Sequence, residues 1–231
     1  MNMLTQMRTA GCRMLGFNNV HFDYPVLHEF ISRMQSVGHV TAADLYAKAQ
    51  AIFAAQRNDF SQTVWESDHF VAQIDIFKIM HFDNVARSTS LKKLEMAMRS
   101  YSVVDLPYAP GTHLTPEQID VTTAYMCHDV AETIKFARQI DDQIRFRDEL
   151  TARYDRDFTN FNDTKIGKQY FIDQMEKAGI ACYDRGTGRR QPRQTPRSEG
   201  IHVGRRLIPI PFETDDLRRM WSFFNAAVIP A

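Results

Sequence analysis

The feature of the sequence that most constrains the fold is one long amphipathic helix, predicted over residues 116–150. Thr115 suits the N-cap, Pro116 suits the first turn, and Gln118 stands where a capping box needs it. Apolar residues then recur every three or four positions, at Met126, Val130, Ile134, Ala137, Ile140 and Ile144. This pattern predicts a helix that buries one face against the rest of a domain.

Shorter elements surround this helix in the sequence. Apolar runs predict strands over residues 14–17 and 70–80, the second with an alternating, β-branched and aromatic pattern. Further helices are predicted over residues 25–38, 41–53 and 164–178, and another begins at Ser90. Alternating strands and helices predict an α/β fold, in which helices pack on a mixed sheet.

The composition excludes several classes of protein. The 231 residues are 44% hydrophobic and 24% charged, which is typical of a globular protein. Lys+Arg and Asp+Glu both total 28, which excludes attraction of the whole chain to nucleic acid or membrane. The widely spaced Cys12, Cys127 and Cys182 predict neither a disulfide framework nor a thiolate zinc site. No apolar run approaches the ~20 residues of a spanning helix, so a cytoplasmic protein without a membrane partner is expected.

Residues 185–206 form the one compositional break in the chain. They contain seven arginines against a single acid, Glu199, together with four of the ten glycines. Such a stretch predicts an exposed basic loop. Arg189, Arg190 and Arg193 could contact DNA phosphates, or serve only as a solvated linker. We place a domain boundary ahead of this stretch, with one domain over residues 1–160 and a connecting segment over residues 161–231.

The segment GFNNVHFD, residues 16–23, is the first candidate for chemistry. Asp23 follows the end of a predicted strand, where open α/β sheets commonly place catalytic carboxylates. The alternative is that Asp23 caps the next helix and that Asn18 and Asn19 only form a turn. His21, Asp23 and His28 also have the residue types of a two-histidine, one-carboxylate iron site, although no further ligand supports that reading.

The segment YMCHD, residues 125–129, is the second candidate. Tyr125 and Asp129 are four residues apart on the long helix, so they share a face at the margin of the apolar stripe. A carboxylate there can hold a metal, and a tyrosine hydroxyl one turn away can orient an attacking water. The alternative is a boundary tyrosine beside a solvated aspartate.

Together these segments resemble two motifs of the DnaQ-like 3′–5′ exonucleases, which have the ribonuclease-H fold. GFNNVHFD is similar to their second motif, G-[YF]-N-x-x-x-[FY]-D, as family B DNA polymerases have it. YMCHD is similar to the third motif, Y-x-x-x-D, of the tyrosine-bearing DEDD subtype. TSLKKL (residues 89–94) and NFNDTKIGKQYF (residues 160–171) are similar to segments of phage-type polymerases, so the resemblance covers most of residues 15–171.

The resemblance implies a ribonuclease-H-like mixed sheet and metal-dependent hydrolysis of the 3′-terminal phosphodiester of DNA, either a single strand or a primer end. Asp23 and Asp129 would bind a pair of Mg²⁺ or Mn²⁺ ions, and Tyr125 would orient the water. Their carboxylates are then expected about 4–8 Å apart. Contacts to nucleic acid would come from Asn18, Asn19, Phe22, Lys92 and Lys93. The alternatives are that Asn18 only positions Asp23, that Phe22 packs in the core, and that the two lysines belong to a solvated surface.

One motif of the family is missing. DEDD nucleases carry D-x-E on their first strand, and these 231 residues contain no D-x-E. Only fifteen residues precede Gly16, so we expect a fragment that starts after this motif and stops before a polymerase palm. Such a chain is expected to be inactive alone, and a separate chain carrying the first motif could complete its site. The alternative is a non-catalytic nucleic-acid-binding or remnant protein of the same fold.

Overall fold

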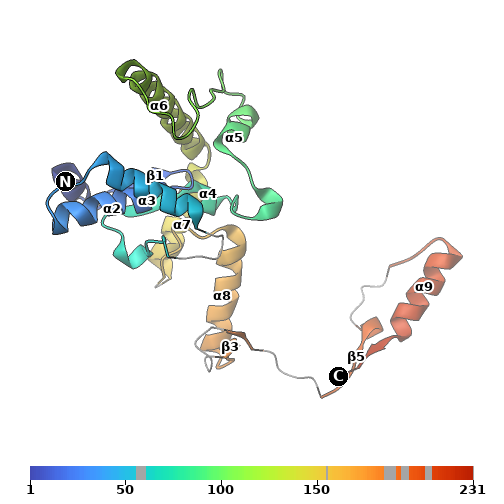
Figure 1. Cartoon of the computed structure of the whole chain (residues 1–231). Helices are drawn as coiled ribbons and strands as arrows, with labels where there is room; N and C mark the ends of the chain where they lie inside the picture. The colour runs from blue at the N-terminus through green and yellow to red at the C-terminus, as the bar shows by residue number, and fades with distance from the viewer. Residues whose placement is uncertain (56–60, 155, 185–190, 194–197, 206–209, 231) are drawn as a thin grey trace. The chain divides into compact units, whose positions relative to one another are not determined.

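The structure is a computed structural model of the chain, in which residues 1–55, 61–154, 156–184, 191–193, 198–205 and 210–230 are described (Figure 1). The chain divides into two compact units, Met1–Gln169 (unit 1) and Tyr170–Ala231 (unit 2). The chain as a whole is α/β, as predicted, and it has far more helix than strand.

Unit 1 is built around a small parallel sheet of β1 (Arg13–Gly16) and β2 (Ala72–Asp75). Arg13 pairs with Ala72, and Gly16 pairs with Asp75. The prediction for the first strand is confirmed to within one residue. The prediction of a strand over residues 70–80 is confirmed only for residues 72–75, and after Asp75 the chain turns into the helix α4 (Ile76–Ile79). The Asp75 carboxylate causes the change, because it accepts a hydrogen bond from the Phe77 backbone N–H at 3.0 Å and so caps this helix.

Helices α1 (Asn2–Thr9), α2 (Asp23–Ser36) and α3 (Ala42–Ala54) come from the first quarter of the chain. The predicted capping box at the start of α3 is present, since Thr41 and Asp44 bond each other's backbone N–H. The two predicted helices in this region are confirmed to within two residues. Leu4 of α1, Ile31 of α2 and Val71 form a buried cluster beside the sheet.

The predicted long helix is two helices, α6 (Pro116–Gln139) and α7 (Asp141–Arg153), as Figure 1 shows. The capping box of Thr115 and Gln118 is present, but the single helix was a wrong prediction at Ile140. Ile140 leaves helical geometry with φ −106° and ψ 18°, and its side chain is buried in the core. Two carboxylates, Asp141 and Asp142, then open α7, where they favour the positive end of its dipole.

The predicted apolar stripe of this region is buried only in its second half. Met126, Val130 and Ile134 are 59%, 58% and 44% exposed, which contradicts their prediction as core residues. Phe136 and Ile140 are buried with residues from β2, α4 and α5 (Leu91–Ala97). α6 has α5 and α7 as its main neighbours, and the exposure of Met126, Val130 and Ile134 shows that neither helix covers this part of its apolar stripe.

The segment that follows α7 closes the outer edge of β2. The Asn160 side chain accepts a hydrogen bond from the Asp75 N–H at 2.8 Å and donates one to the Gln73 carbonyl at 3.0 Å. Arg147, only 1% exposed, donates to the Phe161 carbonyl at 2.6 Å. These contacts tie residue 160 to the sheet and residue 161 to α7, and unit 1 extends to Gln169, past the boundary predicted at residue 160. The helix α8 (Asp163–Lys177) follows and ends before Gly179, close to its prediction.

Unit 2 contains small elements. β3 (Tyr183–Asp184) pairs with β4 (Gln191–Pro192), and β5 (Ile201–His202) pairs with β6 (Val228–Ile229). Two helical segments, η3 (Val203–Arg205) and α9 (Asp215–Ala226), pack on each other. Of the basic stretch, Arg189 and Arg190 lie outside the described residues, while Arg193 is exposed with its Nε 3.8 Å from Asp184. In the described part of the chain, no helix is long and apolar enough to cross a membrane.

Candidate functional site

Residues from both candidate segments line one cleft of about 630 Å³ in unit 1, although Tyr125 is not among the lining residues. Gly16 to Asn19 and Asp23 come from the end of β1 and the start of α2, and Asp129 comes from α6. The structure therefore brings together Asp23 and Asp129, which are more than a hundred residues apart in the sequence. They are the only acidic residues among the described residues that line this cleft.

A buried carboxylate holds the loop between β1 and α2 in place. Asp75 is fully buried, and its two oxygens accept hydrogen bonds from the backbone N–H of Asn18 at 2.9 Å and of Val20 at 3.2 Å. Asn18 has a left-handed backbone with φ 62°, which asparagine tolerates better than most residues. Burial raises the pKa of Asp75, and the three backbone N–H groups that it accepts from oppose the rise.

Close packing of the same loop requires a glycine at its start. A Cβ on Gly16 would lie 2.6 Å from the Cβ of Asn19, closer than side chains approach each other. Asn19 is only 6% exposed, and its side-chain amide lies 2.9 Å from that of Gln73. Asn19 thus has a packing role at the cleft wall, whereas Asn18 is partly exposed there.

Asp23 is the first residue of α2 and is not its N-cap. The N-cap is Phe22, and no side chain caps the helix. The alternative interpretation, in which Asp23 caps this helix, is therefore wrong. Partial burial raises the pKa of the Asp23 carboxyl above its usual value. Phe22 packs on Phe53, with ring centroids 4.9 Å apart, which agrees with the packing alternative for this residue.

Tyr125 and Asp129 interact one turn apart on α6. Burial, together with the nearby Asp129 carboxylate, raises the pKa of Tyr125 to about 12. Next to this pair, the His128 Nε2 lies 3.1 Å from the Oε2 of Glu95, a fully buried residue of α5. This contact joins α5 to α6 and orients the helix that carries Tyr125 and Asp129.

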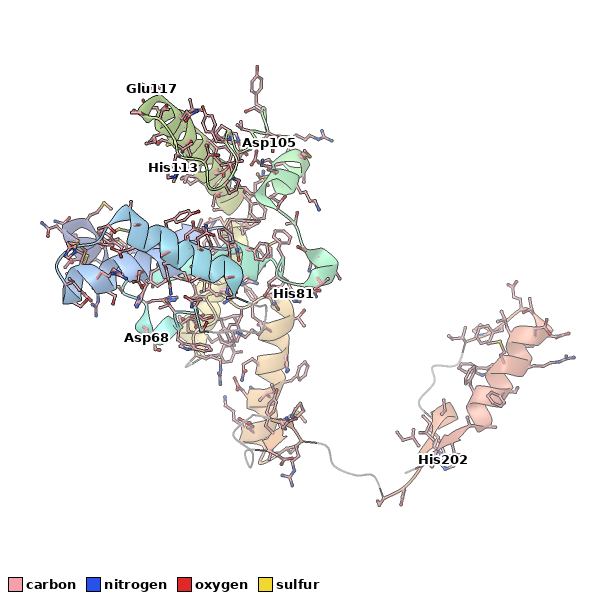
Figure 2. All side chains as sticks on the ribbon, viewed as in Figure 1. Asp68, His81, Asp105, His113, Glu117 and His202 are labelled. Atoms are coloured by element: carbon pink, nitrogen blue, oxygen red, sulfur yellow. The ribbon has the colours of Figure 1, made fainter. Side chains whose placement is uncertain are left out.

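The two lysines predicted to meet nucleic acid differ in their surroundings. Lys92 forms an ion pair with Asp105, which Figure 2 labels beside α5, and its ammonium lies 6.0 Å from the centre of the Tyr125 ring. Lys93 is exposed and has no ion-pair partner among the described residues. Lys92 therefore belongs to the charge balance around Tyr125, and Lys93 is open to solvent.

The carboxylates of the cleft suit a hard divalent cation. Oxygen donors such as Asp23 and Asp129 are the ligands that Mg²⁺ and Mn²⁺ prefer. Among the described residues, however, no three or more His, Cys, Asp or Glu side chains are grouped so that they could hold a metal ion. Of the acidic side chains in the described part of the chain, Asp23 and Asp129 are the two that line the cleft.

Sequence reasoning missed the structural role of the residues that build this site from beneath, Asp75, Gln73 and Asn160. A signal was available, since Gln73 and Asp75 interrupt an otherwise apolar run with groups that need partners when buried. Asn160 carried no comparable signal, because its role depends on a contact 85 positions away along the chain.

The raised pKa of Tyr125 can be tested by titration. We expect ultraviolet titration to assign this tyrosine a pKa near 12, so that its hydroxyl stays a hydrogen-bond donor at every pH suited to the folded protein. Asp129→Asn should lower that pKa, because it removes the negative charge beside the hydroxyl. Tyr125→Phe should delete this titration from the spectrum. An ordinary value near 10 in the unmodified chain would contradict the contact.

Comparison with known proteins does not identify a function for this site. Neither the protein-family models nor the curated proteins nor the solved structures contain a match to the chain. The function of the site must therefore be inferred from the cleft, its two carboxylates and the tyrosine one helical turn from Asp129.

Proposed function

We propose that unit 1 is part of a proofreading 3′–5′ exonuclease domain with a ribonuclease-H-like fold, of the kind found in phage-type, family B-like DNA polymerases. The observation that carries the proposal is the single cleft lined by Asp23 and Asp129, one from each motif. Two motifs of one nuclease site would be expected to meet in this way. Two carboxylates with unrelated roles would not be expected to line the same cleft.

The edges of the small sheet support the proposal. The outer edge of β2 is occupied by Asn160, but no described residue bonds the backbone of β1 on its outer side. Met14, Leu15 and Gly16 of β1 line the cleft instead. A third strand beside β1 would extend the sheet, and two acidic residues at alternate positions of that strand would point to the same face. This is where we place the missing D-x-E motif.

In the completed site, the residues of this chain would have separate roles. Asp23 and Asp129 would each bind metal, and the bound ions would activate water and stabilise the leaving oxygen. Tyr125 would remain protonated and orient the attacking water through its hydroxyl. Asn18, which is partly exposed at the cleft wall, would contact the 3′ end of the strand.

Metal binding by the chain alone tests the assignment without requiring turnover. Mn²⁺ should broaden the NMR signals of residues around Asp23 and Asp129 in a saturable way and at millimolar concentration, since two carboxylates form a weak site. Asp23→Asn and Asp129→Asn should each abolish the selective broadening, and Asp120→Asn, on the same helix but outside the cleft, should preserve it. Broadening spread over the whole surface would refute the assignment.

A second candidate is a non-catalytic protein of the same fold that binds nucleic acid. The observation that favours it is the presence of only two acidic residues in the described part of the cleft. The two candidates differ in one measurable property, since only the nuclease fragment should gain activity when the missing carboxylates are supplied.

A further inference from the structure

The surface around α5 carries cations that no acidic residue neutralises in the described part of the chain. Arg87 of the short helix η2 (Val85–Arg87), Lys93 of α5 and Arg99 just beyond it are all exposed. None of the three has an ion-pair partner among the described residues, whereas the neighbouring Lys92 is paired with Asp105. Unpaired cations along one surface segment favour binding of a polyanion.

An unusually placed aromatic residue follows the last of these cations. The side chain of Tyr101 is fully exposed, and its ring contacts no other ring in the described part of the protein. The neighbouring Val103 and Leu106 are also exposed. An exposed tyrosine beside unpaired cations matches the way single-stranded nucleic acid is bound, in which cations follow the phosphates and an aromatic ring stacks on a base.

The chain segment that carries these residues also borders the candidate site. Thr89, Ser90 and Leu91, at the start of α5, line the cleft that contains Asp23 and Asp129. α5 has seven residues and so extends for about 10 Å from the cleft toward Arg99 and Tyr101. The helix α5 is fixed in place, because Leu94 is buried in the core and Glu95 contacts His128 of α6.

We propose that this surface, made of Arg87, Lys93, Arg99 and Tyr101, binds single-stranded DNA and leads the strand to the cleft. The phosphates would lie along the three cations, and a base would stack on Tyr101. The direction toward the cleft rests on the proposed function. The binding itself does not, and it can be measured without any hydrolysis.

The test of the phosphate contacts is the salt dependence of binding. A fluorescent single-stranded oligonucleotide is titrated with the full chain in EDTA, so that hydrolysis plays no part. The triple variant Arg87→Gln, Lys93→Gln, Arg99→Gln should lower the slope of log affinity against log salt by about 2, or about 0.7 for each lost phosphate contact. The matched variant Arg138→Gln, Lys168→Gln, Lys177→Gln removes three exposed cations elsewhere and should leave the slope unchanged. The proposal would be overturned if the slope of log affinity against log salt were the same in the two triple variants. It would also be overturned if the unmodified chain showed no saturable binding at low salt.

The test of stacking uses the chemistry of the ring. Tyr101→Leu should weaken binding about fivefold or more, and Tyr101→Phe should retain it. The effect of Tyr101→Leu should disappear on an abasic strand, which has no base to stack. An RNA oligonucleotide of the same sequence tests whether binding depends on the sugar. If the chain bound this RNA and did not bind the DNA, the assignment of DNA would be overturned. If these results hold while no supplied carboxylate produces nuclease activity, the proposed function fails and the binding surface stands.

Discussion

With Mg²⁺ or Mn²⁺ present, this chain alone is expected to remove nucleotides from single-stranded DNA at trace rates at most. An added Asp-x-Glu peptide, either separate or fused ahead of Met1, should restore 3′–5′ cleavage by about 10³-fold or more. The reason is that positioned divalent charge contributes several kcal/mol to such a transition state, and two carboxylates hold it poorly. Release of nucleotides from a 5′-labelled oligonucleotide measures the effect.

Matched variants show whether the restored activity belongs to the cleft. Asp129→Asn should abolish it, whereas Asp120→Asn, an exposed acid on the same helix, should leave it intact. Protection of the Met14–Gly16 amides from hydrogen exchange would show that the peptide pairs with β1. Strong activity from the unsupplemented chain that still depends on Asp23 would contradict the argument, as would restored activity that survives Asp129→Asn.

Local interactions were the predictable part of this fold. The two capping boxes, Thr41 with Asp44 and Thr115 with Gln118, were predicted because all of their atoms lie within one turn of chain. The same holds for the start of α5 at Ser90, whose side chain accepts from the Lys93 N–H. Such signals determine where helices begin, whatever the rest of the chain does.

Long-range contacts account for the errors. The helix break at Ile140 depends on burial of that side chain against β2, α4 and α5, which no pattern within residues 116–150 reveals. Periodicity likewise predicted burial of Met126 and Val130, yet a periodic stripe is buried only where another layer covers it. Periodicity thus predicted the helical conformation and could not predict its neighbours.

In the candidate site, too, the local motifs were predicted and the long-range contacts were not. Asp23, Tyr125 and Asp129 were identified from their motifs, and the structure places both carboxylates in one cleft. The structural roles of Asp75 and Asn160 beneath them were missed, because buried polar networks are formed by residues distant in sequence. Those groups carry the largest expected effects on stability.

Replacing Asp75 with alanine is therefore expected to destabilise the protein more than other changes near the cleft. The backbone N–H groups of Asn18, Val20 and Phe77 would all lose their acceptor. Each unpaired buried group costs about 1–3 kcal/mol, and partial access of water to two of them reduces the sum, so we expect a loss of about 3 kcal/mol. Urea unfolding should show this loss, and Asp120→Ala, on an exposed helix face, should change stability little.

The asparagine variant separates hydrogen bonding from charge. Asp75→Asn retains an oxygen for some of the N–H groups and buries no charge, so its cost should be smaller than that of alanine. Burial raises the pKa of Asp75, so the stability that this group contributes is present below its ordinary pKa of about 3.9 and is lost as pH rises through the higher folded value. Asp75→Asn should remove this part of the pH dependence. Faster hydrogen exchange at Asn18 and Val20 in the alanine variant would show that the carboxylate holds the loop that carries Asp23 into the cleft, and unchanged exchange there would mean that the loop keeps its shape without it.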